Sequence, residues 1–188
     1  MGRAEGGVPH LLVASEVASV VALVAVGAWV WSHHGDLPDR IPMHFDGAGH
    51  PDRWEAGTLG NWLLAPLFGL GAALLMLATG RLVAWMAGRW PQLVNVPDKD
   101  LWLRLTPWGR RWALEPCCAG LAVSAVPMAF LFGFIAVQSL EVGHGRRETM
   151  AIWPVFVVVG TVFVATIGGI VASVRRIRRA SRLGSASP

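Results

Sequence analysis

Four long apolar segments dominate the chain, and short polar loops separate them. The segments run over about 11–31, 59–83, 117–137 and 150–174, and each contains few charges. A helix needs roughly 20 apolar residues to cross a bilayer, so each segment is long enough for one span. The pattern therefore predicts an all-α integral membrane protein, a four-transmembrane-helix bundle. The first apolar run exceeds the roughly 7–15 residues of a signal-peptide core, so we expect it to be retained as a helix.

The polar loop between the first two spans, residues 37–54, has more features than a simple connection needs. It contains prolines, two His-x-Asp triplets and a tryptophan within eighteen positions. Gly47 and Gly49 permit a positive φ, and Asp and His side chains readily hydrogen-bond turns. We therefore expect a structured extracytoplasmic loop, in which a tight turn joins two short extended arms.

The loop between the middle spans, residues 89–112, also has a pattern of its own. Asp98 follows turn residues and can cap a short helix. Trp102 and Leu105 would then share the apolar face of that helix, while Lys99 reaches water or phosphate. This arrangement is typical of a short amphipathic helix lying in the cytoplasmic membrane interface.

Composition agrees with membrane insertion. The 188 residues are 54% hydrophobic and 15% charged, with a mean hydropathy of +0.50. Soluble domains carry about 25% charged residues, so this composition excludes an ordinary soluble domain. In chain order we distinguish a first membrane domain (1–112), with two spans, the outer motif loop 37–54 and the inner loop 89–112. A second pair of spans (113–174) and a basic cytoplasmic tail (175–188) follow.

The distribution of basic residues predicts the orientation, because short cytoplasmic loops are enriched in Lys and Arg. Twelve basic residues fall on one side: Arg3, Arg81, Arg89, Lys99, Arg104, Arg110, Arg111, Arg175, Arg176, Arg178, Arg179 and Arg182. Four fall on the other: Arg40, Arg53, Arg146 and Arg147. We expect a multi-pass protein of the bacterial plasma membrane with both termini in the cytoplasm. The pI near 10.4 follows from this asymmetry, and the tail indicates contact with lipid headgroups rather than nucleic acid.

One acidic residue, Glu16, lies inside a predicted span, close to its cytoplasmic end. Charges within a bilayer are costly and often functional. Glu16 is open to two interpretations: a pairing with headgroups or a basic partner, and a functional ion-pair or proton site. The spans contain no second buried charge, which argues against an ion-coupled transporter.

The histidines and aspartates of the outer loop are the remaining candidates for chemistry. Imidazole and carboxylate are ligands for zinc, and histidine titrates near neutral pH, so a metal site and a pH sensor are alternatives to a bracing role. No fixed-spacing metal signature is present, and no nucleophile–base set or phosphate-binding loop is found. Cys117 and Cys118 are adjacent and indicate packing rather than a redox or metal motif. We expect no enzyme activity, no metal and no cofactor.

Tryptophans and small residues suggest how the spans are placed. Most of the ten tryptophans fall near span ends, which predicts two aromatic belts, with Trp62 in the outer belt and Trp102 in the inner one. Small residues at helix-packing spacing, such as Gly69 with Ala73 and Gly120 with Ser124, allow close backbone approach. They fit an intramolecular bundle and a homo-oligomer equally well.

The two loops carry recognisable signatures. The outer loop reads Leu37-Pro38-x-x-Ile41-Pro42-x-His44-Phe45-Asp46-x-x-Gly49-x-Pro51-Asp52-x-Trp54. It closely resembles the signature of a bacterial membrane domain of unknown function, family 1648, which occurs in SdpI-like immunity proteins. The inner loop reads Asn95-Val96-Pro97-Asp98-Lys99-Asp100-Leu101-Trp102. It is similar to the family's second signature, although Leu101 stands where an aromatic residue is usual. The resemblance covers roughly residues 11–112.

This resemblance implies a function. SdpI-like proteins protect producing cells from a secreted toxin peptide and hold a cytoplasmic repressor at the membrane. Our leading hypothesis is toxin-peptide immunity or signal reception, with the lipid bilayer, an extracellular peptide and a cytoplasmic regulator as partners; the alternative is a small transporter or accessory subunit of a membrane complex. The binding candidates are the motif residues of both loops: Pro42, His44, Phe45, Asp46, Gly49, Pro51, Asp52, Trp54, Asn95, Pro97, Lys99 and Trp102.

Overall fold

The computed structural model describes residues 10–184, with side-chain environments as far as residue 180. Arg3 and the last four residues lie outside this described part, as does the side chain of Arg182. Contacts within the chain divide it into two compact units. The hairpin unit comprises Val20–Leu74 and Ala125–Val162. The α3 unit comprises the described residues of Met1–Ser19, Leu75–Ser124 and Phe163–Pro188.

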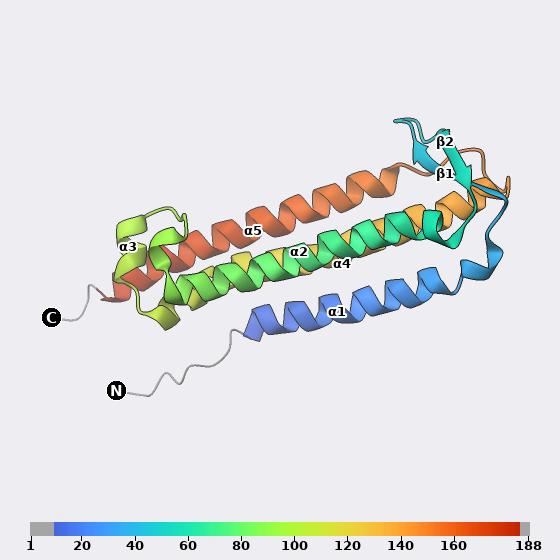
Figure 1. Ribbon diagram of the computed structural model, residues 1–188. Helices are drawn as coiled ribbons and strands as arrows, with labels where there is room; N and C mark the ends of the chain where they lie inside the picture. The colour runs from blue at the N-terminus through green and yellow to red at the C-terminus, as the bar shows by residue number, and fades with distance from the viewer. Residues whose placement is uncertain (1–9, 185–188) are drawn as a thin grey trace. The chain divides into compact units, whose positions relative to one another are not determined.

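Four long helices make up most of the described chain (Figure 1). They are α1 (His10–Trp31), α2 (Leu59–Arg89), α4 (Pro107–Gly143) and α5 (Trp153–Gly184). Each contains a stretch long and apolar enough to cross a membrane. The prediction of an all-α protein with four spans is therefore confirmed, and the chain is a multi-pass membrane protein.

Helix α4 begins at Pro107, ten residues before the apolar run that predicted it. Proline suits the first turn of a helix because its missing N–H would have no partner there. The helix also continues through Pro116 and Pro127. Hydropathy therefore located the membrane-crossing part of α4 but not the polar turns that precede it.

The hairpin unit contains two strands, β1 (Arg40–Phe45) and β2 (Pro51–Ala56), which pair antiparallel (Figure 1). The register is interrupted between Pro42 and Phe45, where a bulge is formed. The prediction of two extended arms joined by a tight turn is confirmed. Ile41 of β1 forms a buried cluster with Val30, Trp62, Ala136 and Leu140.

Trp62 belongs to this core and not to an aromatic belt, which corrects the expectation from the sequence. Its side chain is 2% exposed, and its indole N–H donates to the carbonyl of Ala136 at 3.1 Å. A buried indole needs such a partner, and α4 supplies it. Proximity to a span end alone therefore assigned Trp62 to the wrong environment.

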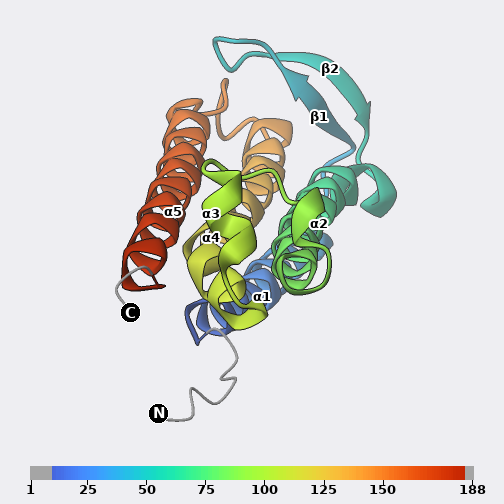
Figure 2. The same cartoon turned by 90° about the vertical axis from the view of Figure 1, so that its left-hand side faces the viewer.

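The α3 unit contains the short helix α3 (Lys99–Arg104), which the sequence predicted (Figure 2). Trp102 is fully buried in this unit and donates its indole N–H to the carbonyl of Pro91 at 3.1 Å. Leu101 and Leu105 pack against the same cluster, which includes Leu12 and Ile177. The apolar face of α3 is thus as predicted, but Trp102 covers protein rather than lipid.

Small residues lie at helix contacts within each unit. A Cβ at Gly120 would come within 2.7 Å of the Ala165 carbonyl oxygen, so α4 and α5 approach closely there. A Cβ at Gly69 would overlap the side chain of Phe132. These two glycines serve intramolecular packing, as the small-residue pattern allowed.

Candidate functional site

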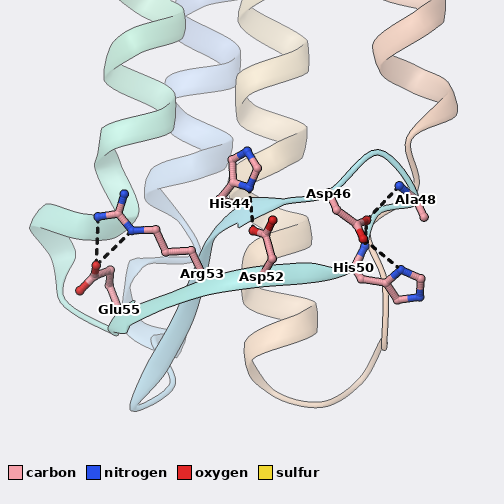
Figure 3. Close-up of polar contacts among 7 residues, drawn as sticks. All are labelled: His44, Asp46, Ala48, His50, Asp52, Arg53 and Glu55. Atoms are coloured by element: carbon pink, nitrogen blue, oxygen red, sulfur yellow. Dashed lines mark hydrogen bonds and ion pairs between the residues drawn. The ribbon is translucent and has the colours of Figure 1, made fainter.

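The turn of the hairpin is organised by Asp46. Its carboxylate accepts the backbone N–H groups of Ala48 at 2.9 Å and of His50 at 2.8 Å (Figure 3). The two backbones also pair here, because the Asp46 N–H donates to the His50 carbonyl. The hydrogen bond from the His50 N–H, with a smaller contribution from that of Ala48, holds the pKa of Asp46 below its ordinary value. The side chain is therefore an ionised brace inside the turn.

Cross-strand pairs continue this bracing along the strands. The His44 ring donates from Nδ1 to the Asp52 carboxylate at 2.6 Å, and the two side chains face each other from β1 and β2 (Figure 3). Arg53 pairs with Glu55 at 3.1 Å on β2 itself. All of these side chains are substantially exposed, so each pair adds order more than stability.

Gly49 ties the tip of the hairpin to the loop between α4 and α5. It has φ +86°, and its carbonyl accepts the Met150 N–H at 2.8 Å. A Cβ at Gly49 would meet the Met150 carbonyl oxygen, so the approach requires glycine for space as well as for backbone conformation. Sequence reasoning assigned Gly49 to the turn but had no signal for its partner, which lies about a hundred residues away.

The base of the hairpin is held by close backbone approach as well. A Cβ at Gly143, the last residue of α4, would come within 2.9 Å of the Arg40 carbonyl oxygen and 2.8 Å of the Pro38 side chain. A Cβ at Gly57 would meet the Pro38 carbonyl. Ile41 is 1% exposed and anchors β1 in the core. The hairpin is thus fixed at both ends.

A groove of about 640 Å³ opens at this base. Seven residues line it: Leu37, Pro38, Asp39, Arg40, Trp54, Gly143 and His144. They combine apolar surface and an indole with an acidic, a basic and an imidazole side chain. The groove is shallow and largely open to solvent.

The outer candidates therefore have different environments. Pro42 is buried beside Ile41, and Phe45 and Pro51 are half-buried. Trp54 alone among the eight outer candidates lines the groove. The histidines and aspartates form two separate pairs, and no group of three His, Cys, Asp or Glu side chains suited to a metal is found within residues 10–184. Asp39 was considered only among the possible metal ligands of the loop, and Arg40 was not a candidate. His144 was missed because nothing in the sequence places the end of α4 beside the loop.

The inner signature has a structural explanation for two of its residues. The Lys99 ammonium donates to the carbonyls of Gln92 at 3.0 Å and of Val94, and so holds the loop that precedes α3. Asp98 is the N-cap residue of α3, as predicted, but its side chain makes no cap and pairs with Arg178 on α5 at 2.8 Å. Lys99 therefore serves the loop rather than phosphate. Asn95 and Pro97 are exposed.

An ion pair that the sequence did not suggest connects three helices in the α3 unit. The Glu115 carboxylate accepts the Leu11 N–H at 2.8 Å with one oxygen and binds Arg176 at 2.9 Å with the other. Arg176 also donates to the Trp112 carbonyl and lies over its ring, 4.7 Å from the centroid. Helix spacing alone would pair Glu115 with Arg111, four residues earlier on α4. Arg176 could not be predicted as the partner, because only the packing of α5 against α4 brings it to Glu115.

Glu16, the acidic residue inside a span, pairs with Arg81 of α2. The Glu16 side chain is 12% exposed, and its second oxygen, Oε1, is buried without a hydrogen-bond partner among the described residues. The interpretation in which Glu16 meets a basic partner is thereby supported by a named residue.

These features define a class: a multi-pass membrane protein with a hairpin, held at both ends, between its first two spans. Residues 18–70, which contain that hairpin, match the family model of a domain of unknown function, DUF1648. The match ends at residue 70, so the inner signature at 95–102 lies outside it. The chain is also 28% identical over 80 residues to an uncharacterised protein of Archaeoglobus fulgidus. That alignment covers 42% of each chain, less than half of the relative's length. No solved structure matches the chain.

Proposed function

We propose that this chain is an SdpI-like receptor or immunity protein of the bacterial plasma membrane, and that its hairpin faces outward and binds a secreted peptide. The observation that supports the proposal best is the groove at the base of a hairpin held at both ends. A fixed site loses little conformational freedom when it binds, which favours affinity. The excess of basic residues in the other loops supports the outward orientation.

The lining of the groove suits a peptide. Trp54, with its flat amphipathic ring, offers contact area at low entropic cost, as in many peptide-binding surfaces. Arg40 and Asp39 place opposite charges in the same groove, and the His144 ring, whose Nδ1 donates to the Leu140 carbonyl at 2.9 Å, adds an imidazole. A peptide with mixed charge and an aromatic or aliphatic side chain would be complementary to this surface.

We propose a role without catalysis. The polar side chains of the hairpin are engaged with one another: His44 with Asp52, Asp46 with the turn, and Arg53 with Glu55. Groups committed to bracing are poorly placed to act on a substrate.

On the cytoplasmic side, we propose that the α3 unit contacts lipid and a regulator. Leu93 is 62% exposed and Leu103 is 43% exposed, beside the exposed Asn95 and Pro97. Arg175 and Arg179 at the end of α5 are exposed and suited to anionic headgroups.

The test is capture of the secreted peptide by tagged protein from its own host, in mild detergent and read by mass spectrometry. Wild type should retain a peptide, and Trp54→Ala should lose it. Arg53→Ala is the matched control, because Arg53 lies on the same strand but outside the groove. Recovery of no peptide by wild type, or equal recovery by all three proteins, would reject the proposal.

A second candidate function, a small transporter or accessory subunit, is favoured by one observation. The pair of Glu16 and Arg81 lies within the spanning helices and leaves a carboxylate oxygen without a partner. Such a site could accept a proton or a cationic substrate. Glu16→Gln should then abolish substrate flux in vesicles, whereas unchanged flux would eliminate this candidate.

A further inference from the structure

A second, smaller cavity lies within the hairpin unit, among the spanning parts of α1, α2 and α4. Its volume is about 160 Å³. Among its lining residues are Leu23, Gly27 and Trp31 of α1, Pro66 and Leu67 of α2, and Gly133 of α4. It shares no lining residue with the groove at the base of the hairpin.

The residues that line the cavity are apolar apart from the Trp31 indole N–H. Its lining has no charged side chain, and the Trp31 indole is the one side chain there that can donate a hydrogen bond. A buried water needs two to four polar partners, so water has little to bind here. Hydrocarbon is therefore the occupant that the lining favours.

Gly27 forms part of the cavity wall and has no side chain there. A Cβ built at Gly27 would touch nothing within 4 Å, and the residue is exposed on the surface of the unit. Val24 and Leu64, which follow the lining residues Leu23 and Leu63 in the chain, are 67% and 55% exposed. In a membrane-spanning helix such side chains contact lipid, so the cavity is continuous with the hydrocarbon of the bilayer.

We propose that this cavity binds one acyl chain of a bilayer phospholipid. An apolar cavity of about 150 Å³ accepts benzene, so this one is large enough for a segment of about six carbons. From Leu23 to Trp31 the lining extends about 12 Å along α1, close to the depth of one leaflet. Trp31, the last residue of α1, is half-exposed and stacks on His34 at 4.6 Å, as expected for the headgroup level. The chain enters from that leaflet, and its site is distinct from the proposed peptide groove.

The experiment uses the full chain in phosphatidylcholine nanodiscs that contain a phosphatidylcholine with a photoactivatable diazirine in one acyl chain. Cross-linked residues are mapped by mass spectrometry. Adducts should concentrate on the cavity lining, and Gly27→Phe, which adds a ring at the wall of the cavity, should lower them at least five-fold. Gly160→Phe is the matched control: Gly160 lies on α5 of the same unit, and its Cβ also would touch nothing within 4 Å.

Two further results keep the interpretation clear. Gly27→Ala should lower the adducts less than Gly27→Phe, and the thermal unfolding of each variant shows whether it is folded. Adducts spread over lipid-facing residues in proportion to their exposure would overturn the proposal. Labelling of the cavity that is the same in Gly27→Phe and Gly160→Phe would do so as well.

Discussion

At the scale of single residues, Asp46 shows how one side chain can set a turn. It accepts two backbone N–H groups that would otherwise depend on water, and these bonds favour its ionised form. Because the folded state lowers the pKa of Asp46, its contribution to hairpin order is complete above the pKa of an unfolded Asp, about 3.9. That contribution is lost as the pH falls through the lower, folded value. The hairpin turn should therefore stay ordered from pH 7 to about pH 4 and loosen below it.

Hydrogen exchange of a peptide covering residues 44–52 measures this directly. Asp46→Ala should lower the protection of these amides, relative to an unstructured peptide, several-fold at neutral pH. Asp46→Asn keeps an acceptor oxygen but cannot titrate, so the protection should no longer fall when the solution is acidified. Loss of protection below pH 4 that persists in Asp46→Asn would show that Asp46 is not the group responsible.

Gly49 is the second residue with an effect beyond its size. Gly49→Ala should cost roughly 1–2 kcal/mol for the left-handed backbone and should also displace Met150. The exchange rate of the Met150 amide and the melting temperature report the two effects. Gly47→Ala is the control, because a Cβ at Gly47 would touch nothing within 4 Å. Equal exchange at Met150 in both variants would show that the tip of the hairpin is not held there.

The bracing of the outer loop by Asp and His could be predicted from the sequence, since the partners lie at most eight residues apart in the same hairpin. The pairing of Glu115 with Arg176 could not, because 61 residues separate them and only the packing of α4 against α5 brings them together. The same applies to Gly143 and His144, which complete the groove from the end of α4. Hydrogen bonds within one hairpin could thus be predicted from the sequence, whereas contacts between distant elements could not.

At the scale of elements, the tie between α1, α4 and α5 should matter more than the exposed pairs of the hairpin. Glu115 is 8% exposed, and removing one member of a buried ion pair leaves the other charge without compensation. Because the Arg176 side chain is 26% exposed and keeps its bond to the Trp112 carbonyl, Glu115→Ala should cost about 1–3 kcal/mol. The exposed pair of Arg53 with Glu55 supplies the control, since Glu55→Ala should cost less than about 1 kcal/mol.

Thermal unfolding in detergent compares the two variants. A double-mutant cycle with Arg176→Gln then isolates the pair from the bond to Leu11. A coupling close to zero would mean that Glu115 acts through Leu11 at the start of α1 and not through α5.

Element prediction succeeded for the four spans, the hairpin and α3, and it missed the polar start of α4. Four spans followed from apolar length alone. The α4 helix starts at Pro107 because its first polar turns pack against other protein segments, which an apolar window does not register. Trp102 illustrates the same limit: a helix face that fits a membrane interface also fits a protein core, and the α3 unit supplies the core.

At the scale of the whole molecule, orientation decides whether the groove can meet a secreted peptide. Twelve basic residues against four predict that the hairpin lies outside and the α3 loop inside. In a background with Cys117→Ala and Cys118→Ala, Gly47→Cys should react with a membrane-impermeant maleimide in intact cells. Asp100→Cys should react only after permeabilisation. Both positions are exposed, so accessibility to water does not distinguish them and the membrane alone does.

The result separates the proposals made at different scales. Labelling in the expected pattern would support the proposal that the groove binds a secreted peptide. The Trp54→Ala and Arg53→Ala variants would then test peptide binding itself. The inverted pattern would place the groove in the cytoplasm and reject a secreted ligand, although the acyl-chain cavity would remain, because either leaflet supplies the same hydrocarbon. Orientation is thus a condition for the peptide proposal, while the lipid proposal depends only on the packing of α1, α2 and α4 within one unit.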